Sequence, residues 1–130
     1  KVELNTVGDY QMFANERDNK NYDIFVGGWF SDYNDPLDFL NVMKTGVYDS
    51  YGLYSNSEYD SLIDSLTGEN DNAKRLEIYQ KLEDLLVAQD CGVAPLYYSD
   101  KHYYYRNWVK DFYTSSFGAS QELYRASVQK

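Results

Sequence analysis

Residues 22–40 read YDIFVGGWFSDYNDPLDFL and combine an apolar run, two glycines, an acidic turn and a second apolar run. A nearly continuous apolar run such as the one before Gly27 is typical of a strand that is buried on both faces. Asp35 can cap a helix, and Pro36 suits the first helical position. The segment therefore predicts a buried strand that ends in glycine, followed by an acidic turn and a short helix.

A strand and a helix are also expected before this segment. Residues 1–4, KVEL, alternate polar and apolar side chains, as half-buried strands do. Asp9 can cap a helix over residues 10–20, where apolar residues recur at helical spacing. A strand, a helix and a strand in this order form the βαβ unit of an α/β fold, which is the fold class we expect.

Two longer helices are expected further along the chain. Residues 57–66 carry an apolar stripe, start with a capping-box-like pattern at Ser57 and precede Gly68, which can end a helix. Residues 71–90 give the clearest helical pattern. One face of this second helix is expected to be buried, and its apolar members are Leu76, Tyr79, Leu82, Leu85 and Leu86.

The C-terminal third of the chain is rich in tyrosine. Residues 92–108, GVAPLYYSDKHYYYRNW, are expected to form a strand, and Pro95 would place it at a sheet edge or at a strand start. The residues from Trp108 onward have no clear pattern. Cys91 is the single cysteine, so no disulfide can form within the chain, and a buried thiol is its expected role.

Size and charge limit the classes of protein. The chain has 130 residues, enough for one domain with a modest core. Its formal net charge of −9 argues against nucleic acid and anionic membranes as partners, because both attract basic surfaces. No apolar run is long enough for a membrane-spanning helix. The 15 tyrosines suit half-wet surfaces and clefts.

Enzymatic and metal-binding interpretations are weak. Asp32, Asn34 and Asp35 faintly resemble a calcium loop, but Leu37 stands where such a loop requires glycine. Asp32 and Asp35 could form a carboxylate pair for hydrolysis, yet Asp35 is better explained as a helix cap. No nucleophile elbow, phosphate loop or histidine-rich metal pattern is present. We therefore expect no catalysis, metal or cofactor.

Trp29 and Asp32 follow directly after the expected strand, where α/β sheets place ligand contacts. A buried carboxylate beside an indole can receive a cation such as an ammonium group. A core tryptophan and a capping aspartate explain the same two residues without any ligand. The segment by itself leaves both interpretations open.

Four stretches in order resemble one known family. They are YDIFVGGWFSDYNDPLDFL at 22–40, YSNSEYDSLI at 54–63, AKRLEIYQKLEDLL at 73–86 and VAPLYY at 93–98. Together they resemble the C-terminal portion of bacterial oligopeptide-binding proteins, which are extracytoplasmic solute-binding proteins of peptide ABC transporters. The resemblance runs from about Val2 to about Val109.

The resemblance implies part of a two-lobed fold of the type II periplasmic-binding-protein kind. Residues 1–99 would form the C-terminal half of one lobe, and residues 100–130 would return toward the other lobe. The start at Lys1, without a signal peptide, fits a piece of a longer protein.

The resemblance also implies ligand contacts. Asp32 would pair with the free amino terminus of a peptide, and Trp29 would line a side-chain pocket. Tyr10 falls on a second pocket aromatic. Arg17 falls on a basic residue that can face peptide carboxylates.

Two positions depart from the family pattern. Well-known members carry an arginine where this chain has Val26, and a tyrosine contact falls on Ser99. These departures concern ligand length and the handling of the carboxylate. The family also includes binders of nickel chelates, cello-oligosaccharides and opines, and the retained Asp32 favours peptides over those ligands.

The expected function is that of a substrate-binding subunit, not an enzyme, which captures short peptides and delivers them to permease subunits of an ABC transporter. The expected location is extracytoplasmic, as a cell-surface lipoprotein or in the periplasm, with membrane contact through a lipid anchor or the permease. A carbohydrate-binding module, or a sugar-binding member of the same fold, is the alternative. A peptide pheromone receptor or an adhesin with this fold is a third possibility.

Overall fold

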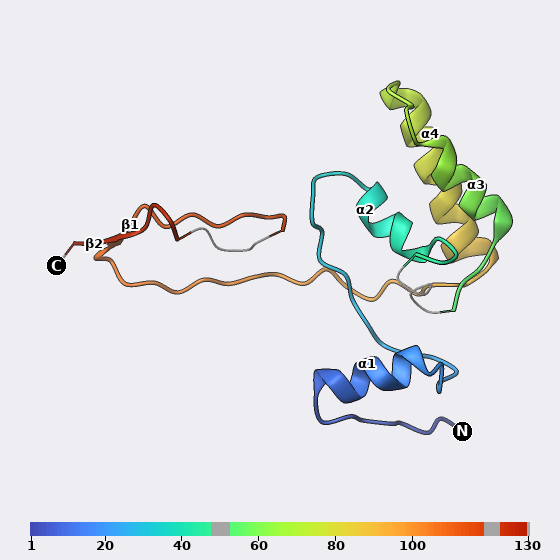
Figure 1. The fold of residues 1–130 in the computed structure, drawn as a ribbon, viewed down its shortest axis with the longest axis horizontal. Helices are drawn as coiled ribbons and strands as arrows, with labels where there is room; N and C mark the ends of the chain where they lie inside the picture. Colours follow the sequence, from blue (N-terminus) through green and yellow to red (C-terminus); the bar gives the residue numbers. More distant parts are fainter. Residues whose placement is uncertain (48–52, 119–122, 130) are drawn as a thin grey trace.

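The computed structural model describes residues 1–47, 53–118 and 123–129. Figure 1 shows an N-terminal helix, a group of packed helices and a long C-terminal arm. We call the packed helices, in residues 37–47 and 53–89, the helical hub, and we call residues 100–118 and 123–129 the arm. The α-helices are α1 (Tyr10–Asp18), α2 (Leu37–Leu40), α3 (Ser57–Ser65) and α4 (Asn72–Glu83). A 3₁₀ turn, η1 (Asn41–Met43), follows α2, and a π-helix, η2 (Asp84–Gln89), continues α4. In the described part of the chain, no helix has the length and apolar character needed to cross a membrane.

The predicted helix over residues 71–90 is confirmed as α4 with η2. Its start is set locally, because the Asp71 carboxylate accepts hydrogen bonds from the backbone N–H of Ala73 at 2.9 Å and of Lys74 at 3.4 Å. The prediction that Leu76 is buried is wrong, since 57% of it is exposed. Leu76 lies roughly 120° around the helix from Leu82, at the margin of the packed face.

The predicted helix at residues 57–66 is confirmed as α3, but its cap lies one residue earlier than expected. Asn56 caps this helix, and its side chain accepts hydrogen bonds from the backbone N–H of Glu58 at 2.8 Å and of Tyr59 at 3.1 Å. Gly68, as expected, lies beyond the end of the helix, with a φ of +82° that suits glycine.

The core lies between the short α2–η1 segment and the two longer helices. Tyr59 and Leu82 are fully buried at its centre. The Tyr59 hydroxyl donates to the Leu40 carbonyl at 2.8 Å, which ties α3 to α2 and satisfies a polar group inside the core. The buried members of the core are Leu40, Val42, Met43, Tyr54, Tyr59, Ile63, Leu66, Tyr79, Leu82, Leu85 and Leu86.

The predicted helix after Asp9 is confirmed as α1, which lies apart from the hub (Figure 1). The Asp9 carboxylate accepts a hydrogen bond from the backbone N–H of Met12 at 2.9 Å. Arg17 lies in the last turn, where a positive charge interacts favourably with the helix dipole.

The strands predicted at residues 1–4, 22–30 and 92–108 are not formed, so the structure does not contain the expected βαβ unit. These segments are largely exposed; Val2 is 92% exposed, and Ile24, which lies in a bend, is 88% exposed. Because a strand is defined by hydrogen bonds to a neighbour, an extended segment without a paired partner is not a strand. Among the described residues, the strands are β1 (Val109–Lys110) and β2 (Ser127–Val128), which form an antiparallel pair.

The C-terminal arm runs away from the hub and folds back toward it (Figure 1). At its turn, the backbone N–H of Gly118 donates to the Ser31 carbonyl at 2.8 Å. On the outgoing side, the Lys101 ammonium lies 4.7 Å from the centre of the Phe30 ring. Through these two contacts the arm touches the segment between residues 27 and 36, which we call the acidic loop.

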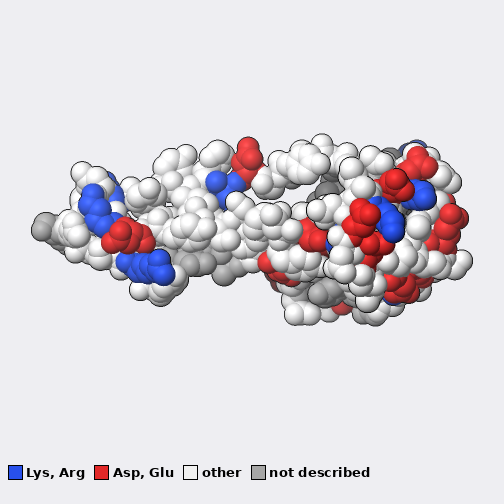
Figure 2. All heavy atoms as spheres, turned by 90° about the horizontal axis from the view of Figure 1, so that it is seen from above, with Lys and Arg blue, Asp and Glu red and all other residues white. Residues whose placement is uncertain are grey.

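Figure 2 shows many acidic side chains over the helical hub and few charges along the middle of the arm.

Candidate ligand-binding site

Trp29 lies in the acidic loop and is half-buried against the core. Its indole Nε1 donates a hydrogen bond to the Asp38 carboxylate at 3.3 Å. The ring is therefore held at both its apolar body and its polar atom, as is usual for a buried indole. The interpretation of Trp29 as a core residue and its interpretation as a pocket wall are compatible with this placement.

Asp32 lies three residues further on and is exposed, so the prediction of a buried carboxylate is wrong. It also does not follow a strand, because residues 22–30 form none. Its backbone N–H donates to Asp38 Oδ2 at 2.8 Å. None of the residues described here pairs with the Asp32 carboxylate itself. Among the described residues, no cation therefore neutralises the Asp32 carboxylate, and its charge can interact with a ligand.

Asp38 is the residue that the sequence analysis missed. It is the second residue of α2 and is 6% exposed, and it accepts hydrogen bonds from both Trp29 and Asp32. A carboxylate inside the apolar run PLDFL was the available signal, because a buried charge requires hydrogen-bond donors. The donors themselves are six and nine residues away, beyond any helical or strand spacing.

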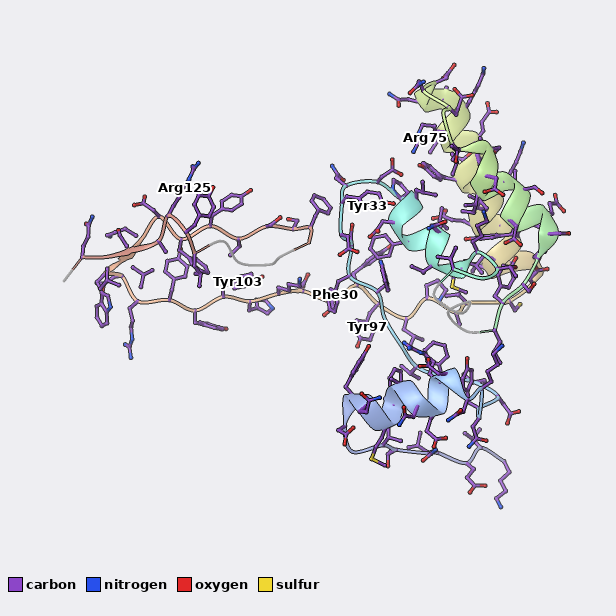
Figure 3. All side chains as sticks on the ribbon, viewed as in Figure 1. Phe30, Tyr33, Arg75, Tyr97, Tyr103 and Arg125 are labelled. Atoms are coloured by element: carbon purple, nitrogen blue, oxygen red, sulfur yellow. The ribbon has the colours of Figure 1, made fainter. Side chains whose placement is uncertain are left out.

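Asp35 anchors the acidic loop to α4. Its carboxylate accepts hydrogen bonds from the backbone N–H of Leu37 at 2.9 Å, from the Tyr79 hydroxyl at 2.5 Å and from Arg75 Nη2 at 2.7 Å. The prediction of Asp35 as the cap and Pro36 as the first helical residue is wrong by one position, because α2 begins at Leu37 and Pro36 occupies its cap position without a side-chain hydrogen bond. Asp35 lies one residue before the cap and still accepts the hydrogen bond from the Leu37 N–H. Figure 3 shows Arg75 on the side of the hub that faces α2.

The electrostatics of this anchor favour its ionised form. Burial alone would raise the pKa of Asp35, but the hydrogen bonds from Tyr79 and Leu37 and the charge of Arg75 outweigh it and hold the pKa below its ordinary value. Burial, the hydrogen bond to Asp35 and the carboxylate charge raise the pKa of Tyr79 to about 12. At neutral pH, Asp35 is a carboxylate and Tyr79 a neutral hydroxyl, as the hydrogen bonds require.

The other predicted contact residues come from different parts of the chain. Tyr10 is the first residue of α1 and is 75% exposed. Arg17, in the last turn of the same helix, forms an ion pair with Asp18 at 2.8 Å. Ser99 lies on the extended, exposed segment that leads into the arm. The structure joins Trp29 to Asp32 through Asp38. The roles of all five residues as ligand contacts remain predictions.

A cavity of about 560 Å³ lies elsewhere, next to the start of α3 and the end of η2. Its polar groups bind one another, because Asp90 accepts hydrogen bonds from the Tyr54 hydroxyl at 2.8 Å and from Asn56 Nδ2 at 2.7 Å. Cys91, predicted to be buried, is exposed at this cavity. None of the predicted contact residues lines it, and we assign it no ligand.

Comparison with solved structures identifies the class of protein. The substrate-binding domain of an oligopeptide ABC transporter from Bacillus anthracis matches 96% of this chain with a TM-score of 0.84 and 28% identity. The pheromone receptor PrgZ, described for its mode of peptide binding, matches 96% of the chain with a TM-score of 0.77 and 27% identity. This chain covers 24% of each of these two structures. The fold is that of part of a peptide ABC transporter substrate-binding domain.

Comparison with curated proteins gives the same family. The periplasmic oligopeptide-binding protein OppA of Salmonella typhimurium is 30% identical over 101 residues, which is 78% of this chain and 18% of that protein. The oligopeptide-binding protein OppA of Bacillus subtilis is 30% identical over 112 residues, which is 85% of this chain and 19% of that protein. No family model matches the chain. The chain is homologous to a portion of the bacterial oligopeptide-binding proteins, as its sequence predicted, and it spans less than a fifth of their length.

Proposed function

We propose that this chain forms part of the substrate-binding subunit of a peptide ABC transporter. The subunit captures short peptides outside the cytoplasm and delivers them to permease subunits in the membrane. The observation that carries the proposal is the likeness of 96% of the chain to an oligopeptide transporter's substrate-binding domain. Homologues that are named as binding proteins and not as enzymes support a role in binding without catalysis.

The acidic loop supplies the chemistry that a peptide requires. A peptide with a free amino terminus carries an ammonium group, and the exposed Asp32 carboxylate has no cationic partner among the residues that the structure describes. We assign Asp32 to the peptide's amino terminus and Trp29 to a pocket for a neighbouring side chain. A charged hydrogen bond of this kind contributes about 1.5–3 kcal/mol to binding.

The remaining predicted contacts complete the proposal. Tyr10 is assigned to a second aromatic wall, Arg17 to peptide carboxylates and Ser99 to a contact from the segment that enters the arm. Residues 1–99 are assigned to one lobe and residues 100–130 to the return toward a second lobe. Closure of two lobes around a peptide would bring these groups together, as in a hinge that a ligand stabilises.

Calorimetry with the full-length protein that contains this chain tests the proposal. We expect trialanine, as a probe with a free amino terminus, to bind, and cellotriose, as a probe of the carbohydrate alternative, to give no heat beyond dilution. Binding of cellotriose without binding of any short peptide would overturn the assignment. Export of the protein beyond the cytoplasmic membrane, assayed by fractionation, is the second requirement, and a cytoplasmic protein would contradict the proposal.

A further inference from the structure

Asp38 is the one buried charged side chain among the described residues. It lies on α2, next to the apolar core, with 6% of its surface exposed. A carboxylate in such surroundings is costly unless donors surround it. An apolar residue at this position would avoid the free-energy cost of burying a charge, so a specific role is needed to explain the carboxylate.

The donors to Asp38 identify this role. Its Oδ2 atom accepts hydrogen bonds from the Trp29 indole Nε1 at 3.3 Å and from the Asp32 backbone N–H at 2.8 Å. These two donors belong to the two residues of the acidic loop that we assigned to ligand contact. A single oxygen thus fixes the orientation of the indole and the path of the backbone that carries the Asp32 carboxylate.

We propose that Asp38 is a positioning residue of the peptide site, which couples the Trp29 ring to the Asp32 backbone without touching the peptide. This inference rests on the proposed function. The Trp29 ring and the Asp32 carboxylate bind a peptide well only if the distance between them is fixed before the peptide arrives. A rigid site avoids the entropy cost of ordering the acidic loop when the ligand binds.

The surroundings of Asp38 make it a firm point of attachment. Asp35, three residues earlier, is bound to Arg75 and Tyr79 of α4, so the start of α2 is held against the hub. On the opposite side of the loop, Gly118 binds the Ser31 carbonyl. The Asp32 backbone N–H is therefore hydrogen-bonded to α2, and the carbonyl of the preceding residue, Ser31, is hydrogen-bonded to the arm.

A structural role alone makes a different prediction. If Asp38 merely stabilised α2, its removal would lower the stability of the hub but leave the preference for a free amino terminus unchanged. A positioning role predicts that the preference for a free amino terminus falls when the Asp38 carboxylate is removed. It also predicts that a neutral side chain of the same shape, with an acceptor oxygen, keeps this preference.

Three variants of the full-length protein separate these roles. Asp38→Leu removes the acceptor, and Asp38→Asn keeps an acceptor oxygen. Asp60→Asn is the matched control, because Asp60 also accepts a backbone hydrogen bond, from Thr45 at 2.9 Å, but outside the acidic loop. The ligands are trialanine and N-acetyl-trialanine, measured by calorimetry. The NMR signal of the Trp29 indole N–H is assigned by its absence from the spectrum of a Trp29→Phe variant.

For Asp38→Leu we expect the Trp29 indole signal to move upfield and the affinity for trialanine to fall about tenfold or more, with a smaller loss for N-acetyl-trialanine. For Asp38→Asn we expect a smaller upfield shift and an affinity within about threefold of wild type. Should Asp38→Leu not fold, the shift of the Trp29 signal in Asp38→Asn decides the question.

An unchanged Trp29 signal in Asp38→Asn would overturn the inference. So would a loss of trialanine affinity in Asp38→Leu no larger than that in Asp60→Asn. Equal losses in Asp38→Leu and Asp38→Asn would replace the positioning role with a direct effect of charge. Failure of the wild-type protein to bind any short peptide would instead refute the proposed function, whereas the Trp29 signal reports on Asp38 without a ligand.

Discussion

Removing the Asp35 carboxylate should release the acidic loop from α4. The substitution Asp35→Ala deletes the acceptor of three hydrogen bonds, from Leu37, Tyr79 and Arg75. Two neutral donors contribute about 1 kcal/mol each and the charged donor about 2 kcal/mol. The Asp35 side chain is 31% exposed and that of Arg75 is 19% exposed, so water replaces part of this interaction. We therefore expect a loss of about 2–3 kcal/mol in the local stability of α2.

Native-state hydrogen exchange in the full-length protein measures this loss. The backbone N–H of Leu40 is the reporter, because it donates to the carbonyl of Pro36, the cap residue of α2, at 3.2 Å. A loss of about 2–3 kcal/mol corresponds to exchange that is about 30- to 150-fold faster. The control is Asp64→Ala, which removes a more exposed ion pair with Lys44 and should change the exchange of Leu40 by no more than about fivefold. Equal effects of the two substitutions would refute the reasoning.

Two further predictions concern the same loop. Tyr79 has a pKa raised to about 12, so the stability that its neutral hydroxyl contributes should be full below about pH 10 and lost as the pH rises through 12. In Asp35→Asn, a carbon-13 tyrosine NMR titration should give Tyr79 a lower pKa, and an unchanged value would contradict the anchor. Gly118→Ala should weaken trialanine binding measured by calorimetry, because the φ of Gly118 is +59° and its added Cβ would lie 3.3 Å from the Asp32 carbonyl oxygen. Gly8→Ala, with no atom within 4 Å of the added Cβ, is the control, and equal affinities of the two variants would count against the contact.

The helices could be predicted from sequence because their signals are local. Asp9 and Asp71 each bind backbone N–H groups two or three residues away, so a cap and its helix lie in one short window. The strands could not be predicted in this way. The pattern around Ile24 has the composition of a buried strand, but a strand requires a paired neighbour, and Ile24 is 88% exposed here. Composition predicted a strand at this position, but it could not show whether a paired neighbour was present.

The site could be predicted only in part. Trp29 and Asp32 were singled out by their spacing and by the family resemblance, and the structure joins them through a third residue. Asp38 escaped because its donors are brought to it by the turn of the acidic loop. Arg75 escaped for a related reason, since 40 residues separate it from Asp35. Contacts between distant segments depend on the whole fold, which local patterns do not encode.

The central claim is that the Asp32 carboxylate receives the amino terminus of a peptide. Calorimetry of the full-length protein and its Asp32→Asn variant, with trialanine and N-acetyl-trialanine, tests it most directly. We predict that the variant loses about 10- to 150-fold in affinity for trialanine and little for the acetylated peptide, because only the former offers an ammonium group. Equal affinity of wild type and variant for trialanine would contradict the claim.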